Sequence, residues 1–479
     1  MRAYLIPVFL CSIGASYAQI PGTLTATGSM ITARFRHTAT LLPEGKVLIA
    51  GGNISCTFGG PCIPATNGEL YDPASGVFTA IGVMNTIQPV GGILLPNGEV
   101  FFAEGYPVGA RARIELYDPS SGGFRIAGAS PSLPVVWSAA LLNDGTVFMT
   151  GITAFGSGAE IYDPVANAST PITTWPANIG YAAVLAVLPD NRILLDTPAI
   201  FDPATGSLTK LGPWSFNDSP PASLLADGKV LVTGGNTDGG NVNWTDVFDA
   251  ADGTFARTGN MSFVRDAHTS TLLPAGEVLV TGGATSCNPT TRADNVTDSA
   301  EIYDPATGTF SLTGSMTTPR LSHAAVVLKN GQVLVTGGQV NSPPDGPARY
   351  FEGTSAAELY TPAALIPAPV LLSEVGDGQG QGLIWHANTG EIASPAKPAA
   401  AGEFLSMYTT SLLKGGLVRP QVAVGGRLAE VVYFGDAPGY PGYYQVNFRV
   451  PGGAASGATV PIRLTYLGRP SNEVSIAVQ

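Results

Sequence analysis

The sequence has little charge, little histidine and no long apolar run that could cross a membrane. Charged residues make up 12% of its 479 residues, and only 4 histidines and 4 cysteines are present. Lys and Arg number 23 against 35 Asp and Glu, and the net charge of −12 argues against a nucleic-acid partner. No stretch approaches the ~18 consecutive apolar residues of a transmembrane helix, so no membrane span is expected.

Familiar catalytic patterns are also missing from the sequence. We find no G-x-S-x-G elbow, no H-E-x-x-H pair and no Walker phosphate loop. What the sequence does have is 60 Gly, 39 Pro and an apolar fraction of 44%. A disordered chain would carry far more charge, and a helical bundle could not hold so much Gly and Pro. The composition therefore favours an all-β protein with many tight turns.

The first residues have the pattern of a cleavable signal peptide. Arg2 supplies a short basic segment, an apolar stretch follows from Leu5 to Ile13, and small residues flank the end at Ser16-Tyr17-Ala18. We expect residues 1–18 to be removed, which places the mature chain outside the cytoplasm, in the periplasm or the extracellular space. A retained apolar anchor is the alternative interpretation.

Three cysteines remain after that cleavage, in an oxidising compartment. Cys56 and Cys62 flank a short TFGGP loop and are expected to form a disulfide bond. Cys287 is then left over. It is either an unpaired thiol or a partner for a cysteine elsewhere, because connectivity is not written in a sequence.

A repeat covers about two thirds of the chain. One unit reads HTATLLPEGKVLIAGG from His37 and continues, after a loop, as GELYDPASGVFTAIG. Its turn recurs seven times, at Gly45, Gly98, Gly145, Asn191, Gly228, Gly276 and Gly331. The spacing of these turns is the period of a propeller blade rather than of a short solenoid.

Each repeat can be divided into four strands. Two nearly all-apolar runs, such as TATLL and KVLIA, are joined by a Gly-containing turn and are typical of strands buried on both faces. A third strand, ELYDP, ends in an Asp-Pro turn closed by Gly, and a shorter, more polar fourth strand follows. Seven such units around one axis predict a seven-bladed β-propeller over residues 19–362.

The sequence also predicts how the ring closes. After the seventh third strand, at Glu358 to Pro362, no fourth strand follows. GTLTATGSM at Gly22 to Met30 matches GTFSLTGSM at Gly308 to Met316 almost residue for residue. The N-terminal strand is therefore expected to complete the last blade, which removes the open edge of the ring.

The motifs that end and begin the strands resemble those of kelch repeats. Gly-Gly pairs end the second strands of four units, and Arg-x-x-His precedes the first strand of three units. The pairs of Arg and His are Arg34 with His37, Arg265 with His268, and Arg320 with His323. The resemblance implies a kelch propeller with its long second-to-third-strand loops on one face.

These Arg and His side chains have two interpretations. They could line the mouth of the central channel as cationic or metal-binding groups. Repetition at equivalent positions instead favours a scaffold role, in which they bond neighbouring blades and carboxylates, including Asp266, and hold the ring together.

Residues 363–479 form a second module. Short alternating runs, from Glu403 to Tyr408 through Glu473 to Val478, predict an immunoglobulin-like β-sandwich. The stretch from VAVGGRLAEVVYFGD to SNEVSIAV resembles the C-terminal domain found on many secreted proteins of acidobacteria, which implies a bacterial exported protein. This module holds seven basic and seven acidic residues, so the excess acid lies on the propeller.

A propeller followed by such a sandwich also resembles galactose oxidase and the other copper radical oxidases. That resemblance implies a copper ion held by two imidazoles and a tyrosinate, with a cysteine cross-linked to the tyrosine. Where that family has Tyr-His in the last blade, this chain has Ser322-His323. Within the second module, His386 is the sole imidazole that could serve as a ligand. We therefore expect no metal and no cofactor, with copper confined to this alternative.

The loops break the symmetry of the repeats. Second-to-third-strand connections are long in blades 5, 6, 7 and 1, which are contiguous in a closed ring, and such loops are where binding usually occurs. The candidate binding residues in or beside them are Trp214, Trp244, Arg292, Arg349, Tyr350 and Phe351. The sequence thus predicts a secreted protein that binds a carbohydrate or protein ligand through this wall of loops. A copper oxidase and a purely structural envelope protein are the alternatives, and ordinary loop decoration is the plainer interpretation of the wall.

Overall fold

The computed structural model describes residues 22–57, 60–86, 88–105, 111–176, 179–212, 220–238, 240–287, 294–340 and 350–479. All regular structure in these ranges is β-strand. In the same ranges, no helix has the length and apolar character needed to span a membrane. The expected signal peptide lies outside the described residues.

Seven four-stranded antiparallel sheets, with three smaller sheets in their loops, make up the regular structure of the described chain before residue 362. The first consists of β2 (Thr38–Leu41), β3 (Val47–Ala50), β6 (Asn67–Asp72) and β7 (Val77–Val83). The second consists of β8 (Pro89–Leu94), β9 (Val100–Glu104), β10 (Arg113–Asp118) and β11 (Gly123–Ala129). The third consists of β12 (Val135–Leu141), β13 (Val147–Thr153), β14 (Gly156–Asp163) and β15 (Ala168–Pro171).

The remaining four sheets repeat this pattern. The fourth has β16 (Val184–Val187), β17 (Ile193–Leu195), β18 (Ala199–Asp202) and β19 (Ser207–Lys210). The fifth has β20 (Ala222–Leu224), β21 (Val230–Thr233), β24 (Thr245–Asp249) and β25 (Thr254–Arg257). The sixth has β26 (Thr269–Leu272), β27 (Val278–Thr281), β30 (Ala300–Asp304) and β31 (Thr309–Leu312). The last has β32 (Ala324–Val327), β33 (Val333–Thr336), β35 (Ala357–Thr361) and β1 (Thr23–Ala26).

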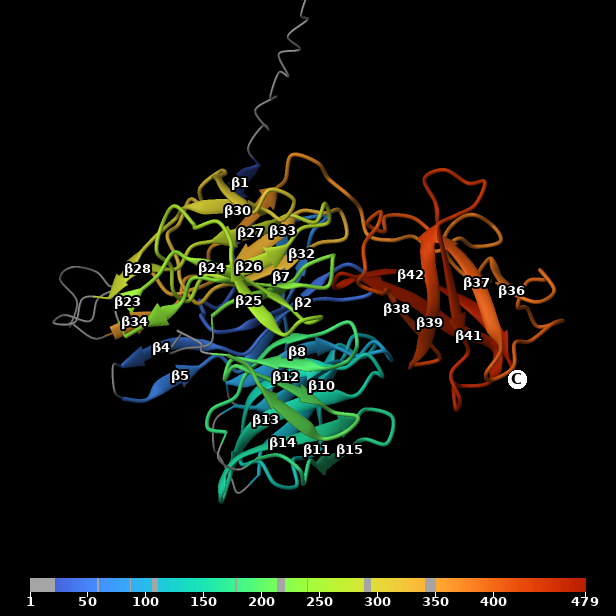
Figure 1. The fold of residues 1–479 in the computed structure, drawn as a ribbon, viewed down its shortest axis with the longest axis horizontal. Helices are drawn as coiled ribbons and strands as arrows, with labels where there is room; N and C mark the ends of the chain where they lie inside the picture. The colour runs from blue at the N-terminus through green and yellow to red at the C-terminus, as the bar shows by residue number, and fades with distance from the viewer. Residues whose placement is uncertain are drawn as a thin grey trace, which may run out of the picture.

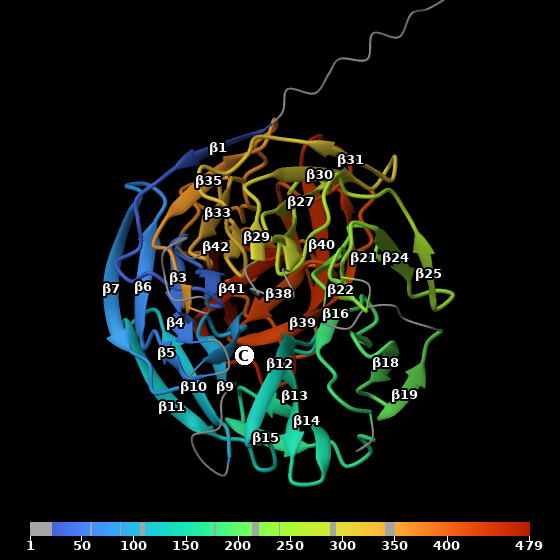
Figure 2. The same cartoon turned by 90° about the vertical axis from the view of Figure 1, so that its left-hand side faces the viewer.

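The seven sheets form a ring of blades (Figure 2). The innermost strand of each blade contacts the innermost strand of the next, from β2 through β8, β12, β16, β20, β26 and β32 back to β2. The expected all-β architecture, a propeller followed by a β-sandwich, is therefore confirmed. The expected domain limits at residues 18 and 362 stay predictions.

The ring closes through the N-terminal strand, as the sequence predicts. β1 pairs antiparallel with β35, with Thr23 opposite Thr361 and Ala26 opposite Glu358. The last blade therefore takes three strands from one end of this part of the chain and its outer strand from the other. This pairing covers the edge that β35 would otherwise expose.

The turn chemistry explains why each blade folds back on itself. The residue that ends the Asp-Pro turn has a positive φ, 70° at Gly76 and 51° at Asn167 of blade 3, a conformation in which a Cβ is strained. The carbonyl of Asp72 accepts a hydrogen bond from the Gly76 amide, and its carboxylate accepts one from the Ala74 amide. In blade 4 the left-handed position of the first turn is taken by Asn191, with a φ of 72°.

The tyrosine of the third strand packs against an aromatic residue of the outer strand of the same blade. Tyr71 is fully buried, and its ring centroid lies 4.7 Å from that of Phe78 on the outer strand. The same contact recurs between Tyr303 and Phe310, at 5.0 Å. Because these rings reach the interface with the neighbouring blade, each core cluster of the ring contains residues of two blades.

The rest of the chain forms a sheet of seven strands, folded on itself as a sandwich around one apolar core. In spatial order the strands are β36 (Ile384–His386), β37 (Phe404–Thr409), β40 (Tyr444–Arg449), β39 (Arg427–Asp436), β38 (Gln421–Val424), β41 (Gly457–Tyr466) and β42 (Arg469–Val478). Figure 1 shows this sandwich at one end of the molecule and the propeller beside it.

The sandwich docks on the propeller face that carries the turns between first and second strands. The guanidinium of Arg463, on β41, donates to the carbonyl oxygens of Leu95 and Pro96 at 3.1 and 3.0 Å. The Leu417 amide donates to the Ala226 carbonyl at 2.7 Å. The long second-to-third-strand loops therefore occupy the face of the ring opposite the sandwich (Figure 1).

Candidate functional site

Extra strands of the long loops form the candidate binding face. They are β4 (Asn53–Thr57), β5 (Cys62–Pro64), β22 (Asn236–Thr237), β23 (Gly240–Asn241), β28 (Ala284–Cys287), β29 (Asp294–Val296) and β34 (Tyr350–Glu352). They project together from one face of the ring (Figure 1).

Loops of neighbouring blades are joined to one another. β34 of the last blade pairs with β4 of the first, with Phe351 opposite Cys56. The Asn241 side chain of blade 5 donates to the Ala284 carbonyl of blade 6 at 2.9 Å. The predicted disulfide between Cys56 and Cys62 is present and joins β4 to β5. The loops are therefore a built surface, held by strand pairing across blade boundaries.

Of the predicted binding residues, the structure describes some and leaves others outside the described part. Trp244 is half-buried beside β24, and the guanidinium carbon of Arg257 lies 4.7 Å from its ring centroid. Phe351 lies within β34. Tyr350 begins that strand, and its side chain, like that of Cys287, lies outside the described part. Trp214, Arg292 and Arg349 lie outside the described residues altogether.

The repeated arginines are buried inside single blades. The Arg34 guanidinium donates to the carbonyl oxygens of Gly51 and Asn67 at 3.1 and 2.9 Å, and to the Glu69 carboxylate at 2.8 Å. Arg265 makes the same contacts with Gly282, Ser299 and Glu301, and Arg320 with Gly337, Ala356 and Glu358. All three ion pairs have side chains at most 1% exposed.

The repeated histidines link neighbouring blades. His37 Nε2 lies 2.9 Å from the hydroxyl of Thr336 in the last blade, so it bridges the point of ring closure. His268 lies 2.9 Å from Thr233 Oγ1, and His323 lies 3.0 Å from Thr281 Oγ1. Burial, with the nearby arginines, lowers the pKa of His37 and His268 to about 3. These imidazoles are therefore neutral near pH 7, which does not fit a cationic ring at the channel mouth.

The Gly-Gly pairs make room for these histidines. A Cβ at Gly338 would come within 2.8 Å of the His323 Cβ, and a Cβ at Gly282 within 2.8 Å of the His323 Cε1. One imidazole thus packs against a glycine of its own blade and a glycine of the blade before it. The contacts of Arg, His and Gly support the scaffold interpretation. The carboxylates that the arginines meet are Glu69, Glu301 and Glu358 rather than Asp266.

The residues suggested as copper ligands lie on both modules, His323 before β32 of the propeller and His386 on β36 of the sandwich. Among the described residues, no group of three His, Cys, Asp or Glu side chains is placed to hold a metal ion. His386 lies in the sandwich, where Nδ1 is 2.6 Å from Glu403 Oε1 and Nε2 is 3.0 Å from the Lys397 carbonyl. Burial opposes its protonation, but the bonds to Glu403 and Lys397 outweigh it and raise its pKa. Both ring nitrogens are engaged, so these residues do not fit a copper site.

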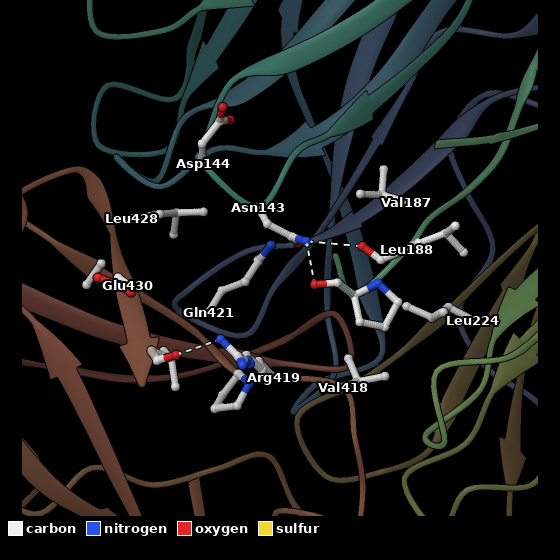
Figure 3. Close-up of a pocket in the computed structure, with 14 residues that line it drawn as sticks. Asn143, Asp144, Val187, Leu188, Leu224, Val418, Arg419, Gln421, Leu428 and Glu430 are labelled. Atoms are coloured by element: carbon white, nitrogen blue, oxygen red, sulfur yellow. Dashed lines mark hydrogen bonds between the residues drawn. The ribbon is translucent and has the colours of Figure 1, made fainter. Parts of the chain in front are cut away.

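The sequence did not indicate a cavity between propeller and sandwich. It measures about 390 Å³ and is lined by Asn143, Leu188 and Leu224 of the propeller and by Arg419 and Gln421 of the sandwich (Figure 3). The Asn143 amide donates to the carbonyls of Leu188 and Pro189, and Arg419 donates to the carbonyl of Val431. An adjoining cavity of about 470 Å³ includes Leu467, between β41 and β42. The linings are largely apolar, and no sequence motif marks them because they exist only through docking.

An aromatic pair that no sequence motif marks lies on the other side of the ring. Trp137 and Tyr181 lie with ring centroids 4.6 Å apart, and Tyr181 is 50% exposed. Phe155, in the turn after β13, is 90% exposed. These residues lie outside the predicted wall of blades 5, 6, 7 and 1.

The fold defines this chain as an all-β protein with a propeller and a C-terminal β-sandwich. No protein-family model and no curated protein sequence matches it. Among solved structures it is similar to a fungal alcohol oxidase of the AA5 family in complex with copper. That match has a TM-score of 0.60 and 17% sequence identity, and it covers 96% of this chain and 99% of the oxidase. At this identity the similarity shows that the two proteins share a fold and shows nothing of the chemistry.

Proposed function

We propose that the chain is an exported, kelch-type binding protein that recognises a carbohydrate or protein ligand through the loops of blades 5, 6, 7 and 1. The observation that carries this proposal is the pairing of β34 with β4 across two blades, reinforced by the Cys56–Cys62 disulfide. Ordinary connections between strands of a propeller do not need such bracing. A rigid surface made of joined loops is what a binding site requires.

The chemistry of the region supports binding rather than catalysis. The buried ionisable groups near the loop bases are neutral histidines and paired Arg–Glu side chains, and these lie in the framework. The disulfide supports an oxidising compartment, which agrees with the signal peptide expected over residues 1–18. The sequence resemblance of the C-terminal module to a domain of exported acidobacterial proteins is a further argument for export in this proposal. In this proposal the chain uses no metal and no cofactor.

The test is a screen of the full chain on glycan and peptide arrays, followed by variants. Phe351→Ala and Arg349→Ala are expected to weaken binding of the hit by about tenfold each, since Phe351 lies in β34 and Arg349 belongs to the same loop in the sequence. Phe155→Ala is the matched control, because that ring is 90% exposed on the turn after β13, outside the wall. Binding that all three variants leave unchanged would place the site elsewhere. The absence of any hit would favour a purely structural envelope protein.

Copper-dependent alcohol oxidation is the second candidate, because the similar fungal enzyme was solved with copper. Both ring nitrogens of His386 are engaged, and residue 322 is a serine where the copper oxidases have a tyrosine, which speaks against it. Metal analysis after incubation with Cu²⁺ tests it, and we expect well under one copper per chain. Stoichiometric copper that is lost in His37→Gln and His323→Gln variants would overturn the binding proposal in favour of this candidate.

A further inference from the structure

The two outer faces of the sandwich differ in what covers them. The half that contains β38, β41 and β42 faces the propeller, as the bonds of Arg463 to Leu95 and Pro96 show. The other half is made of β36, β37, β40 and the end of β39. Its strands β36 and β37 lie on the side away from the propeller (Figure 1). Its outer face is available to a ligand.

Strand register places a row of side chains across that outer face. Trp385 on β36 lies opposite Ser406 on β37, which lies opposite Asn447 on β40, which lies opposite Tyr433 on β39. Residues directly opposite one another in antiparallel strands point to the same side of the sheet. The row therefore has an aromatic ring at each end and small polar groups between. Its two ends are separated by three strand spacings, about 14 Å.

A second row runs beside the first. Tyr408 on β37 lies opposite Gln445 on β40, which lies opposite Gly435 on β39. The Tyr408 ring centroid is 5.3 Å from that of Trp385 and 5.5 Å from that of Tyr440, so three rings gather at one side. At the other side Gly435 has no side chain, and a Cβ there would come within 2.9 Å of the Tyr433 hydroxyl. The face is thus a shallow platform with aromatic margins.

The floor of the platform consists of amides that keep hydrogen-bonding capacity. The Gln445 amide nitrogen donates to Ser406 Oγ at 3.2 Å and to Asn447 Oδ1 at 2.9 Å. Within the described residues, Gln445 Oε1 and Asn447 Nδ2 make no side-chain hydrogen bond. One acceptor and one donor on amides held by their neighbours therefore remain available for hydrogen bonds to a ligand.

The platform is electrically balanced. The guanidinium of Arg449 lies 4.7 Å from the ring centroid of Phe404 and 3.4 Å from the Glu430 carboxylate. The whole C-terminal module has seven basic and seven acidic residues. A charged ligand would find no uncompensated partner here, so the charge pattern favours an uncharged one.

We propose that this outer face binds an uncharged polysaccharide. The faces of sugar rings carry C–H groups that pack on exposed aromatic rings such as Tyr433 and Tyr440, beside the half-buried Tyr408, while the hydroxyls pair with fixed amides such as Gln445 and Asn447. The exposure of Tyr433 and Tyr440, 44% and 58%, leaves the rings accessible. The site lies on a different module from the loop wall and does not depend on it.

The experiment measures binding of the full chain to cellulose, xylan and mannan, with polygalacturonate as the charged comparison. We expect binding to at least one uncharged polymer and none above background to polygalacturonate. A Tyr408→Ala/Tyr433→Ala double variant should weaken that binding by about tenfold or more, because both aromatic margins are lost. The Tyr408→Phe/Tyr433→Phe variant keeps the rings and should bind within about threefold of the unmodified chain.

Further controls distinguish a loss of binding at this site from a loss at the loop wall and from misfolding of the variant. Phe155→Ala on the propeller removes a ring that is even more exposed, at 90%, and should leave polysaccharide binding unchanged. Matching melting temperatures show that each variant is folded. Failure of all three uncharged polymers to bind, or equal binding by the double Ala variant, would overturn the proposal. Loss of polysaccharide binding in the Phe351→Ala variant alone would also overturn this proposal, and it would support binding at the loop wall instead.

Discussion

Blades 1, 6 and 7 differ from blades 2 and 3 in the partners of a buried glutamate on the third strand. In both groups its carboxylate accepts hydrogen bonds from backbone amides of the segment that enters the blade. Glu69 accepts from Ile31 and Thr32, and Glu160 accepts from Ser132. In blades 1, 6 and 7 the carboxylate also pairs with a buried arginine. In blades 2 and 3 it forms no ion pair within the described residues.

The difference shows which part of the motif is general. The glutamate fixes the entering segment wherever it occurs, whereas the arginine adds a bond to the first carbonyl of the Gly-Gly pair. That carbonyl stands where the second strand ends and the long loop begins. The arginine therefore braces the base of a loop, and it occurs in three of the four blades that carry the predicted wall.

The largest effect should come from breaking one of these ion pairs. Glu301→Gln leaves the guanidinium of Arg265, which is 0% exposed, without its counter-charge. An uncompensated buried charge costs about 3–5 kcal/mol of unfolding free energy. Chemical denaturation of the variant and the unmodified chain measures this loss.

Glu160→Gln is the matched control from the other group of blades. Glu160 Oε1 accepts three hydrogen bonds, from Ser130 and Ser132, while Oε2 is buried and accepts none. A glutamine can keep the acceptor and place its amide at the other position, so we expect a loss of about 1 kcal/mol. Equal losses in the two variants would mean that the arginine adds nothing beyond the general motif.

A smaller effect separates two glycines with the same backbone conformation. Gly51 and Gly122 both have a φ of 68°. A Cβ at Gly51 would overlap the ring of Pro89 in the next blade, whereas nothing lies within 4 Å of a Cβ at Gly122. Gly122→Ala should cost about 1 kcal/mol through backbone strain alone. Gly51→Ala should cost about 2–4 kcal/mol, since steric overlap adds to the strain.

The same denaturation assay measures both glycine variants. If their losses agree within about 0.5 kcal/mol, blade packing does not require the first glycine of the pair. A melting transition of Gly51→Ala that splits in two would show instead that blades 1 and 2 have separated.

The fold could be predicted from the sequence because the same turn residues recur in most of the repeats. Gly76 and Asn191 take the left-handed conformations that their turn positions predict. The duplicate of residues 308–316 at residues 22–30 predicted the pairing of β1 with β35. These are local signals whose meaning does not depend on the rest of the chain.

The site was less predictable because its signals are not local. Trp244 looked like a loop aromatic, but it packs against Arg257 of the outer strand β25. The platform around Asn447 arises from the register of four strands, and the cavity beside Gln421 arises from docking of two modules. Neither register nor docking can be read from spacing along one strand.

The last comparison sets a propeller histidine against the sandwich histidine, which should respond to pH with opposite signs. Burial lowers the pKa of His268 to about 3, so between pH 6.5 and 3 the unfolded chain binds the extra proton and stability falls as the pH falls. His268→Gln removes this contribution. Between pH 7 and 5 the variant should lose about 2 kcal/mol less unfolding free energy than the unmodified chain.

His386 has a raised pKa, because its bonds to Glu403 and Lys397 outweigh its burial, so its contribution to stability is present below pH 6.5 and fades as the pH rises. His386→Gln should therefore be most destabilising at pH 5 and least at pH 8. If the loss of unfolding free energy changed with pH in the same direction in both variants, the placement of one histidine would be wrong.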